Sequence, residues 1–522
     1  MDDVTDVTTV PARRRDKCHR LTLAGHDCVF EAYLERLGSG DAATVGSFLA
    51  ELDQRCLLPR SQKDEMRRDF ERALVWYDHA GVALTEALTR LAMTNLGGFY
   101  ARPSQAWYRL DDAAKIYPLS MRHGRMEVFR LAARLTSPVV PELLQMALTF
   151  TVKRFPTFAT SVKKGMFWHY LDAAKRRHVI SPETDLPCQP LKIAGSSAPP
   201  FRVAWYRDRI SVEYFHVLTD GAGGMVFLKT LVAEYLRLLT GADPASTPDD
   251  GILDVNAAAS AQEAANEFPR AEKTELTSGF IDKRATQMGG HLSRIKPCRV
   301  LHFRIDAEQL RAVARRRNAT VTAYLLACMF VAGRAATDEL TGEHSIQVPV
   351  DMRKFYPSRT LRNFSMYCGV RLGLDQIGDL DTVLPAISDQ LTRKASKSAM
   401  SQMLNSTLRI VTTTRWVPLF IKAPVARLIY GFLGDSIFSN TLSNLGVVTF
   451  PEPLASQVAV LDFVLGAPQT NRASCALVTY GGTATLSITK VTLDPSFEET
   501  VHALLTADGI DVTVEGTAPH EG

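Results

Sequence analysis

The chain has little net charge for its length. Its 60 lysines and arginines are nearly balanced by 56 aspartates and glutamates, which leaves a formal charge of +4 over 522 residues. Nucleic-acid binding needs a concentrated basic face, whereas the basic runs here, at 13–15, 175–177 and 315–317, are short and far apart. We expect solvated surface at these runs and no nucleic-acid partner.

Closely spaced metal ligands are also missing. The eight cysteines stand at positions 18, 28, 56, 188, 298, 328, 368 and 475 without a C-x-x-C pair, and the histidines show no H-E-x-x-H. Zinc sites and zinc hydrolases depend on such spacings, so no metal is expected and a metal hydrolase is disfavoured. Cys328 lies in an apolar helical run and is interpreted as a core residue in a reducing compartment.

Long uninterrupted apolar runs are absent as well, so no membrane-spanning helix is predicted. The nearest approach is Trp416–Leu433, which Lys422, Arg427 and two prolines interrupt. We interpret it as a buried helical segment, with a helix lying at a membrane surface as the alternative. The acidic residues at the amino terminus do not resemble a signal peptide, and a cytoplasmic location is expected.

The composition is that of a globular protein, with 46% hydrophobic and 22% charged residues. The length suits two cores and an extension, and apolar spacing predicts helices from 28 to 96. A segment from 241 to 297, rich in small and polar residues, is interpreted as a partly mobile crossover linker. The periodicity predicts helices at 139–154, 163–174, 225–239, 307–316 and 320–335, and strands at 201–207, 210–216, 299–305 and 483–489.

The strongest chemical signal is the motif His-Val-Leu-Thr-Asp-Gly at 216–221, which reads H-x-x-x-D-G. It follows the alternating residues Ser211–Phe215 and precedes Ala-Gly-Gly. A strand is thus predicted to end at His216, with a helix beginning past the glycines and permissive backbone beside the ring. A histidine held in this way can take a proton near neutral pH. The alternative is a polar loop whose backbone satisfies the imidazole.

This motif resembles the active-site signature of the chloramphenicol-acetyltransferase-like superfamily, which includes condensation domains, plant BAHD acyltransferases, polyketide-associated acyltransferases and alcohol acetyltransferases. The resemblance implies an α/β fold of two similar subdomains with a tunnel between them. It places a first subdomain carrying the motif at 97–242, a crossover linker at 243–298 and a second subdomain at 299–522, and it leaves a helical extension at 1–96 outside the resemblance.

The resemblance also implies roles within the motif. His216 would be the general base, Asp220 would pair with an arginine of the other subdomain, and Gly221 would leave room for a thioester arm. Phe215 stands where condensation domains usually have a second histidine, so simple acyl transfer is favoured over peptide-bond formation.

Later segments supply further candidates. Arg353 ends a predicted strand and is our candidate partner for Asp220, because a guanidinium suits a carboxylate bidentately; a solvated basic residue is the alternative. Asn363 lies in a segment that resembles the Gly-x-Phe-x-Asn region of the superfamily. Ser443 and Asn444 resemble a polar segment near the tunnel and are candidates for substrate or oxyanion contacts, although Ser443 suits a turn equally well.

Two longer segments refine the branch. Trp107–Pro118 resembles the opening of the bacterial alcohol-acetyltransferase-like proteins. Asp462–Pro468 resembles the structural Asp-Phe-Gly-Trp-Gly motif of BAHD enzymes, but the middle Gly and Trp are replaced, which weakens that assignment.

The resemblance implies an acyltransferase that moves an acyl group from a pantetheine thioester to an acceptor hydroxyl, or less readily an amine. The donor would be acyl-CoA or an acyl carrier protein, acting as a co-substrate rather than a bound cofactor. No serine or cysteine lies in a nucleophile elbow, so no covalent enzyme intermediate is expected. A monomer is expected. The alternative function is a non-catalytic relative that binds acyl chains or a carrier protein.

Overall fold

The computed structural model describes residues 27–92, 94, 96, 107–120, 126–173, 176–193, 198–242, 251–270, 272, 283–432, 435–467 and 471–516. The basic run at 13–15 and the end of the Asp462–Pro468 segment lie outside these ranges. The chain divides into two compact units, one made by Met1–Arg102 with Lys175–Arg177 and the other by Pro103–Ala174 with His178–Gly522.

The first unit is helical in its described part. Residues 27–36 form a helix, followed by α2 (Ser39–Arg55), α3 (Arg60–His79) and α4 (Leu84–Arg90). Its core consists of apolar side chains at helical spacing, as the sequence predicts, and they are almost fully buried: Val45, Leu49, Leu52, Phe70, Leu74 and Tyr77.

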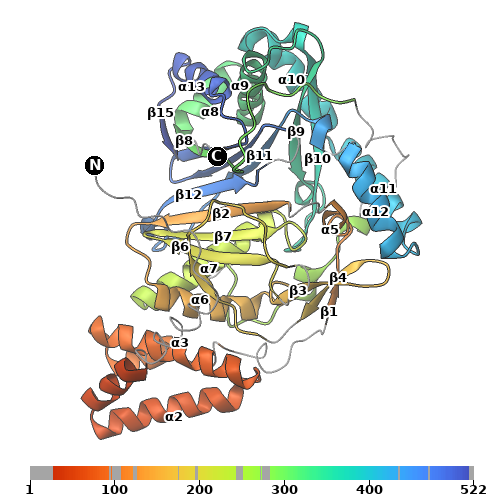
Figure 1. The fold of residues 1–522 in the computed structure, drawn as a ribbon. Coiled ribbons are helices and arrows are strands. Elements are labelled where there is room, and N and C mark those ends of the chain that lie inside the picture. Colours follow the sequence, from red (N-terminus) through yellow and green to blue (C-terminus); the bar gives the residue numbers. More distant parts are fainter. Residues whose placement is uncertain are drawn as a thin grey trace. The chain divides into compact units, whose positions relative to one another are not determined.

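The second unit contains a five-stranded sheet in the order β12-β2-β7-β6-β5. Two helices lie on one face of this sheet, and we call the assembly the first lobe (Figure 1). Aromatic rings fill the space between sheet and helices; Phe158 and Phe227, for example, stack with centroids 4.6 Å apart. The elements are β2 (Val128–Leu135), α6 (Pro141–Arg154), β5 (Ile180–Pro182), β6 (Phe201–Tyr206), β7 (Arg209–Phe215) and α7 (Gly221–Thr240).

A second lobe is built on a seven-stranded sheet in the order β10-β9-β11-β13-β14-β8-β15. Four helices gather beside it (Figure 1), and the buried helix α9 carries the fully buried Cys328. The elements are β8 (Arg299–Asp306), α8 (Ala307–Arg316), α9 (Val321–Ala335), β9 (Glu343–Asp351), β10 (Ser365–Gly373), α10 (Leu380–Lys394), β11 (Asn440–Val447), β13 (Ala473–Tyr480), β14 (Thr483–Lys490), α13 (Ser496–Ala507) and β15 (Val512–Gly516).

One strand joins the lobes. β12 (Val458–Leu465) lies between β11 and β13 in the sequence, yet it pairs antiparallel with β2 of the first lobe, with Leu465 opposite Phe129. The buried carboxylate of Asp462 on β12 forms an ion pair with Arg304 on β8. Burial alone would raise the pKa of Asp462, but His302 and Arg304 outweigh it and hold the pKa below its usual value.

A small sheet corrects one prediction. Residues 163–174, predicted to be helical, contribute instead to β3 (Thr160–Lys164) and β4 (His169–Ala173), which pair with each other and with β1 (Trp107–Arg109). The cause is the turn between the strands. The Gly165 N–H donates to the Trp168 carbonyl at 3.0 Å, and a Cβ at Gly165 would lie 2.6 Å from that oxygen. Only glycine allows so close an approach.

The segment before the second lobe and the helix near its end also differ from expectation. The described residues 251–270 are bonded to both lobes, since Glu263 forms a bidentate ion pair with Arg154 and accepts from the Leu361 N–H. α11 (Lys397–Thr413) is followed by α12 (Leu419–Phe432), which is helical as predicted. The prediction that this segment is buried is wrong, because Trp416 and Phe420 are 68% and 77% exposed. Among the described residues, no helix is long and apolar enough to cross a bilayer.

Candidate active site

His216 follows the last residue of β7, where the predicted strand end placed it. Its backbone N–H donates to the Glu127 carbonyl at 2.9 Å, just ahead of β2. Tyr117, on the short helix α5 (Tyr117–Ser120), stacks on the imidazole with centroids 4.7 Å apart, and Phe129 lies at 5.2 Å. The ring is therefore held between aromatic faces, and the residue is only partly buried.

Asn363 of the second lobe fixes the orientation of that ring. His216 Nδ1 and Asn363 Oδ1 are 2.8 Å apart. The amide nitrogen of Asn363 donates to the His216 carbonyl at 2.9 Å and to the Asp111 carboxylate at 3.2 Å. The amide oxygen must therefore accept, so Nδ1 carries the proton and Nε2 keeps its lone pair. No described residue forms a hydrogen bond with Nε2.

The charge state of His216 suits a base. Burial lowers the pKa of the imidazole below 6.5, against the opposing effects of the Asn363 hydrogen bond and of Asp220. The ring is consequently neutral at neutral pH, which is the form that accepts a proton.

Asp220 ties the two lobes together. Its carboxylate receives Arg353 Nη1 at 2.8 Å and Nη2 at 3.3 Å, and it also accepts from the Phe364 N–H at 2.8 Å. Burial alone would raise the pKa of this carboxyl, but Arg353 and the N–H donors hold it below its usual value. The arginine proposed from the sequence is thus the one in contact with Asp220.

The same carboxylate also starts the helix that follows the motif. Asp220 is the N-cap of α7 and accepts from the Gly223 N–H at 3.0 Å. A Cβ at Gly221 would lie 2.7 Å from the Leu445 side chain, and one at Gly223 would lie 2.2 Å from the Leu361 carbonyl oxygen. These glycines let the first lobe approach the second closely.

Arg353 lies on a short 3-10 turn after β9, so the strand ends at Asp351 rather than at the arginine itself. Beyond Asp220 it donates to the carbonyls of Thr360 and Arg362 at 2.9 and 2.7 Å. The guanidinium therefore closes the loop 353–362 on itself and presents Asn363 to His216.

Asp111, Tyr117 and Arg362 belong to the site but were given no role by the sequence. Asp111 is fully buried, accepts from Asn363, and lies 3.4 Å from the Arg362 guanidinium. The segments Trp107–Pro118 and 362–364 had both been singled out by resemblance. Asp111 and Tyr117 could have been identified from the sequence, because a carboxylate lies close to aromatic residues in the segment Trp107–Pro118.

Ser443 and Asn444 lie on β11 and differ in direction. Asn444 Nδ2 donates to Thr322 Oγ1 at 3.0 Å, and its Oδ1 accepts from the Gly446 N–H at 2.7 Å, so its amide holds the strand to α9. Leu442 is buried in the core of the second lobe. Strand alternation places Ser443 on the opposite face, which is the face of Leu445 and of the contact with Gly221.

A cavity of about 890 Å³ lies elsewhere in the second unit, beside β1, β4 and α11, and His216 is not among its lining residues. In the part of the chain that the structure describes, no cluster of His, Cys, Asp and Glu is arranged to hold a metal ion.

Comparisons with proteins of known structure identify the fold. No protein-family model and no curated protein sequence matches the chain. Among solved structures, the trichothecene 15-O-acetyltransferase TRI3 from Fusarium sporotrichioides matches with a TM-score of 0.50 and 13% identity, over 77% of this chain and 94% of that one. This chain has the chloramphenicol-acetyltransferase-like fold.

Two further structures agree on this two-lobed fold. The starter condensation domain of rhizomide synthetase, solved with C8-CoA and Leu-SNAC, has a TM-score of 0.50 and 13% identity over 77% of this chain and 95% of that one. Fusarium sporotrichioides TRI101, complexed with coenzyme A and T-2, has a TM-score of 0.50 and 12% identity over 76% and 97%.

Proposed function

We propose that this protein is an acyltransferase that moves an acyl group from a pantetheine thioester to an acceptor hydroxyl, with His216 as general base. The observation that carries the proposal is the bond between His216 Nδ1 and Asn363 Oδ1, which leaves Nε2 of a neutral ring without a hydrogen-bond partner among the described residues. The similar structures, a 15-O-acetyltransferase, a condensation domain with C8-CoA and a protein complexed with coenzyme A, support the same chemistry.

The reaction needs only what the site holds. Nε2 takes the hydroxyl proton while the acceptor oxygen attacks the thioester carbonyl, and a tetrahedral oxyanion forms. When this intermediate collapses, the C–S bond breaks and the imidazolium returns its proton to the departing sulfur. Ser443 is our candidate donor to the oxyanion, because it lies on the face of β11 that meets the motif.

Asn363 acts in this scheme as a positioning residue. Both of its amide hydrogens are engaged by protein acceptors, so neither is left to stabilise an oxyanion. Asp220 and Arg353 hold the lobes in register, and Gly221 allows their contact near the path we propose for the thioester arm. An amine acceptor is less favoured because Phe215, at the position of a second histidine in condensation domains, is fully buried.

The test measures thiol release from acetyl-, octanoyl- and palmitoyl-CoA with a panel of alcohols, using the purified full chain. We expect His216→Ala to lower kcat/KM by roughly a hundredfold or more while its melting curve is unchanged. His79→Ala is the matched control, because His79 is exposed at the end of α3. Transfer at the parental rate by His216→Ala would remove this residue from the mechanism. Tight binding of acyl-CoA without any transfer would instead favour the non-catalytic alternative.

A further inference from the structure

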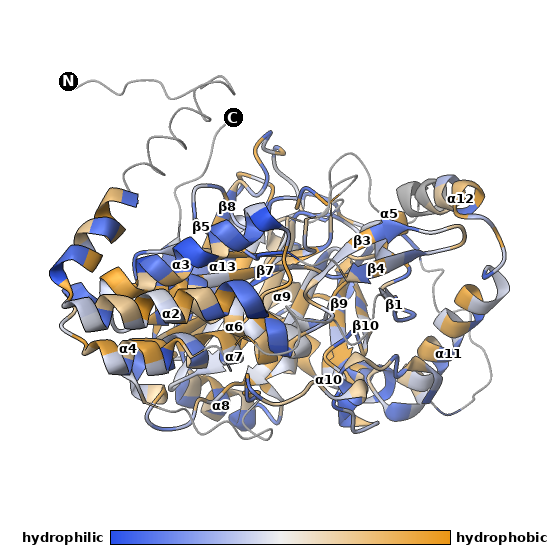
Figure 2. Ribbon diagram, turned by 90° about the horizontal axis from the view of Figure 1, so that it is seen from below, coloured by the Kyte–Doolittle hydropathy of each residue, from blue (hydrophilic) through white to orange (hydrophobic). Residues whose placement is uncertain are grey.

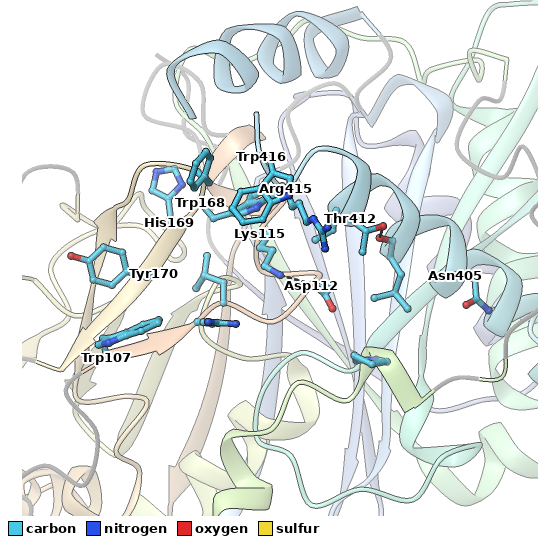
Figure 3. Close-up of a pocket in the computed structure, with 16 residues that line it drawn as sticks. Trp107, Asp112, Lys115, Trp168, His169, Tyr170, Asn405, Thr412, Arg415 and Trp416 are labelled. Carbon is cyan, nitrogen blue, oxygen red and sulfur yellow. Dashed lines mark hydrogen bonds and ion pairs between the residues drawn. The ribbon is translucent and has the colours of Figure 1, made fainter. Parts of the chain in front are cut away.

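The cavity beside β1 and β4 has mainly apolar walls (Figure 3). Aromatic and aliphatic side chains form most of its surface: Trp107, Leu110, Phe167, Trp168, Tyr170, Leu408, Val411 and Trp416. Leu110 and Asp112 flank Asp111, which is hydrogen-bonded to Asn363, the residue that orients His216. The segment that lines one part of the cavity is thus linked to the candidate base through the hydrogen bonds of Asp111 and Asn363.

Cations surround these aromatic walls. Lys422 Nζ lies 3.3 Å from the centroid of the Trp168 ring, and Lys115 Nζ lies 5.9 Å from the same centroid. The Arg415 guanidinium lies 5.4 Å from the Trp416 ring. Trp168 therefore sits between two ammonium groups, and a second tryptophan carries a guanidinium close by.

Most of these cations lack a carboxylate partner. Lys115 pairs with Asp112 at 2.6 Å, but none of the ion pairs among the described residues involves Arg109, Arg415 or Lys422. Lys422 is only 7% exposed. Burial lowers the pKa of its ammonium group to about 8, and the nearby Lys115 adds to the effect. Three cations, Arg109, Lys115 and Arg415, line the cavity with the carboxylate of Asp112, so the lining has an excess of positive charge that an anionic group would relieve.

The mouth of the cavity is apolar. Five large hydrophobic residues are exposed beside it, and we call them the apolar rim: Met166 (74%), Trp416 (68%), Phe420 (77%), Ile421 (48%) and Val425 (52%). The Leu419 N–H donates to the Met166 carbonyl at 2.8 Å, which joins the turn between β3 and β4 to α12. Figure 2 shows the hydrophobic residues of α12 in orange. Several large apolar side chains exposed on neighbouring segments are typical of a binding face.

The charge around the rim has one sign. From 398 to 434 the chain contains four lysines and arginines and no aspartate or glutamate, and Lys163 and Lys164 precede the rim residue Met166. Exposed aromatic and aliphatic side chains among basic residues are the composition of a surface that lies on an anionic bilayer. A water-soluble nucleotide would give the apolar rim no role.

We infer that the apolar rim seats the protein on an anionic lipid bilayer, and that the cavity takes one anionic amphiphile from it as the acyl acceptor. The apolar chain of this lipid would lie against Trp168, Leu408 and Trp416, with its acidic group near Arg109 and Arg415, which also line the cavity. The inference rests on the proposed function only for the word acceptor, since binding of the lipid needs no chemistry at His216.

The experiment is co-flotation of the full chain with vesicles of phosphatidylcholine alone and of phosphatidylcholine with phosphatidylglycerol. We expect binding to the anionic vesicles, reduced about tenfold by Phe420→Ser, because an inserted phenylalanine contributes about 1.4 kcal/mol or more. Arg415→Gln should reduce it about fivefold. Leu340→Ser and Arg294→Gln are matched controls, because Leu340 is 80% exposed and Arg294 is exposed, and neither belongs to the rim.

A second arm separates cavity from rim. Soluble monomers of dihexanoylphosphatidylglycerol should change the tryptophan fluorescence of the parent and of Phe420→Ser alike, and Leu408→Trp, which narrows the cavity, should abolish this response. The inference is overturned if anionic and neutral vesicles bind equally, if the controls lose binding as much as Phe420→Ser, or if only an acidic carrier protein binds the rim.

The two proposals fail separately. His216→Ala should bind anionic vesicles like the parent. Vesicle binding without any acyl transfer would leave the lipid site standing and remove the enzyme, whereas transfer to small alcohols without vesicle binding would do the reverse.

Discussion

Two histidines of this protein are each bonded to an asparagine, and their surroundings differ. His216 Nδ1 lies 2.8 Å from Asn363 Oδ1 across the boundary between the lobes. His344 Nε2 lies 3.1 Å from Asn440 Oδ1 inside the second lobe. Burial lowers the pKa of both imidazoles, that of His344 to about 4.

The difference lies in the second nitrogen of each ring. His344 is 1% exposed, and its Nδ1 is buried without a hydrogen-bond partner. A Cβ at Gly333 would lie 2.3 Å from its Cε1, so the ring is wedged between α9 and β9. His216 is only partly buried. A neutral, oriented imidazole is thus not enough for base chemistry; its free nitrogen must also be reachable by substrate.

The largest predicted effect comes from removing Asp220, which holds together the two lobes that carry His216 and Asn363. Asp220→Ala removes the carboxylate that Arg353, Phe364 and Gly223 share, and it leaves the mostly buried guanidinium with the less buried Asp351 carboxylate, 3.0 Å away, as its ion-pair partner. We expect a loss of about 3–5 kcal/mol in the free energy of unfolding, measured by chemical denaturation. Asp306→Ala is the control, since Asp306 caps α8 without an ion pair and should cost only about 1 kcal/mol. Equal losses in the two variants would contradict the clamp.

The next largest effect is the loss of stability at acidic pH that His344, bonded to Asn440, should cause. The folded pKa of His344 is about 4 and its unperturbed value is 6.5, so below pH 6.5 the unfolded chain binds the proton first. Stability therefore falls as the pH drops from 6.5 to 4, by about 3 kcal/mol from this residue. His344→Gln, which cannot titrate, should lose that much less over the same range. Parallel pH curves for the two proteins would show that His344 is not buried as described.

The smallest effect sharpens the comparison at the first pair. Asn363→Ala removes one hydrogen bond that fixes the ring of His216, and we expect kcat to fall about tenfold, the equivalent of about 1.4 kcal/mol. That bond favours the protonated ring, so its loss lowers the pKa of His216 further and moves the acid limb of the rate profile to lower pH. A purely structural role would lower the melting temperature without moving the limb.

The sequence predicted much of the framework because its signals are local. The strand–motif–helix order around His216, and helix α8 at its observed bounds, follow from periodicity over a few residues. The 163–174 hairpin was missed because its turn depends on Gly165 approaching the Trp168 carbonyl, which apolar spacing does not report. The exposure of Phe420 was missed because hydropathy measures a preference for burial and not the presence of a covering surface.

The site was only partly predictable because its contacts span long stretches of chain. Arg353 was named as the partner of Asp220 from the chemistry of the pair. The bonds that set the tautomer of His216 join Asn363 and Asp111, which are 252 residues apart. Nothing near either residue in the sequence indicates that they meet.

The exchange of β12 restricts how the molecule can work. In the sequence, β12 lies among the strands of the second lobe, but its backbone hydrogen bonds are to β2 of the first lobe. The lobes therefore cannot move far apart without breaking the hydrogen bonds between β12 and β2. Substrates must then enter, and products must leave, through movements of side chains and loops while the two sheets stay in place. If the first lobe were expressed without β12, β2 would become an unpaired edge strand, and the protein would be prone to aggregate through it.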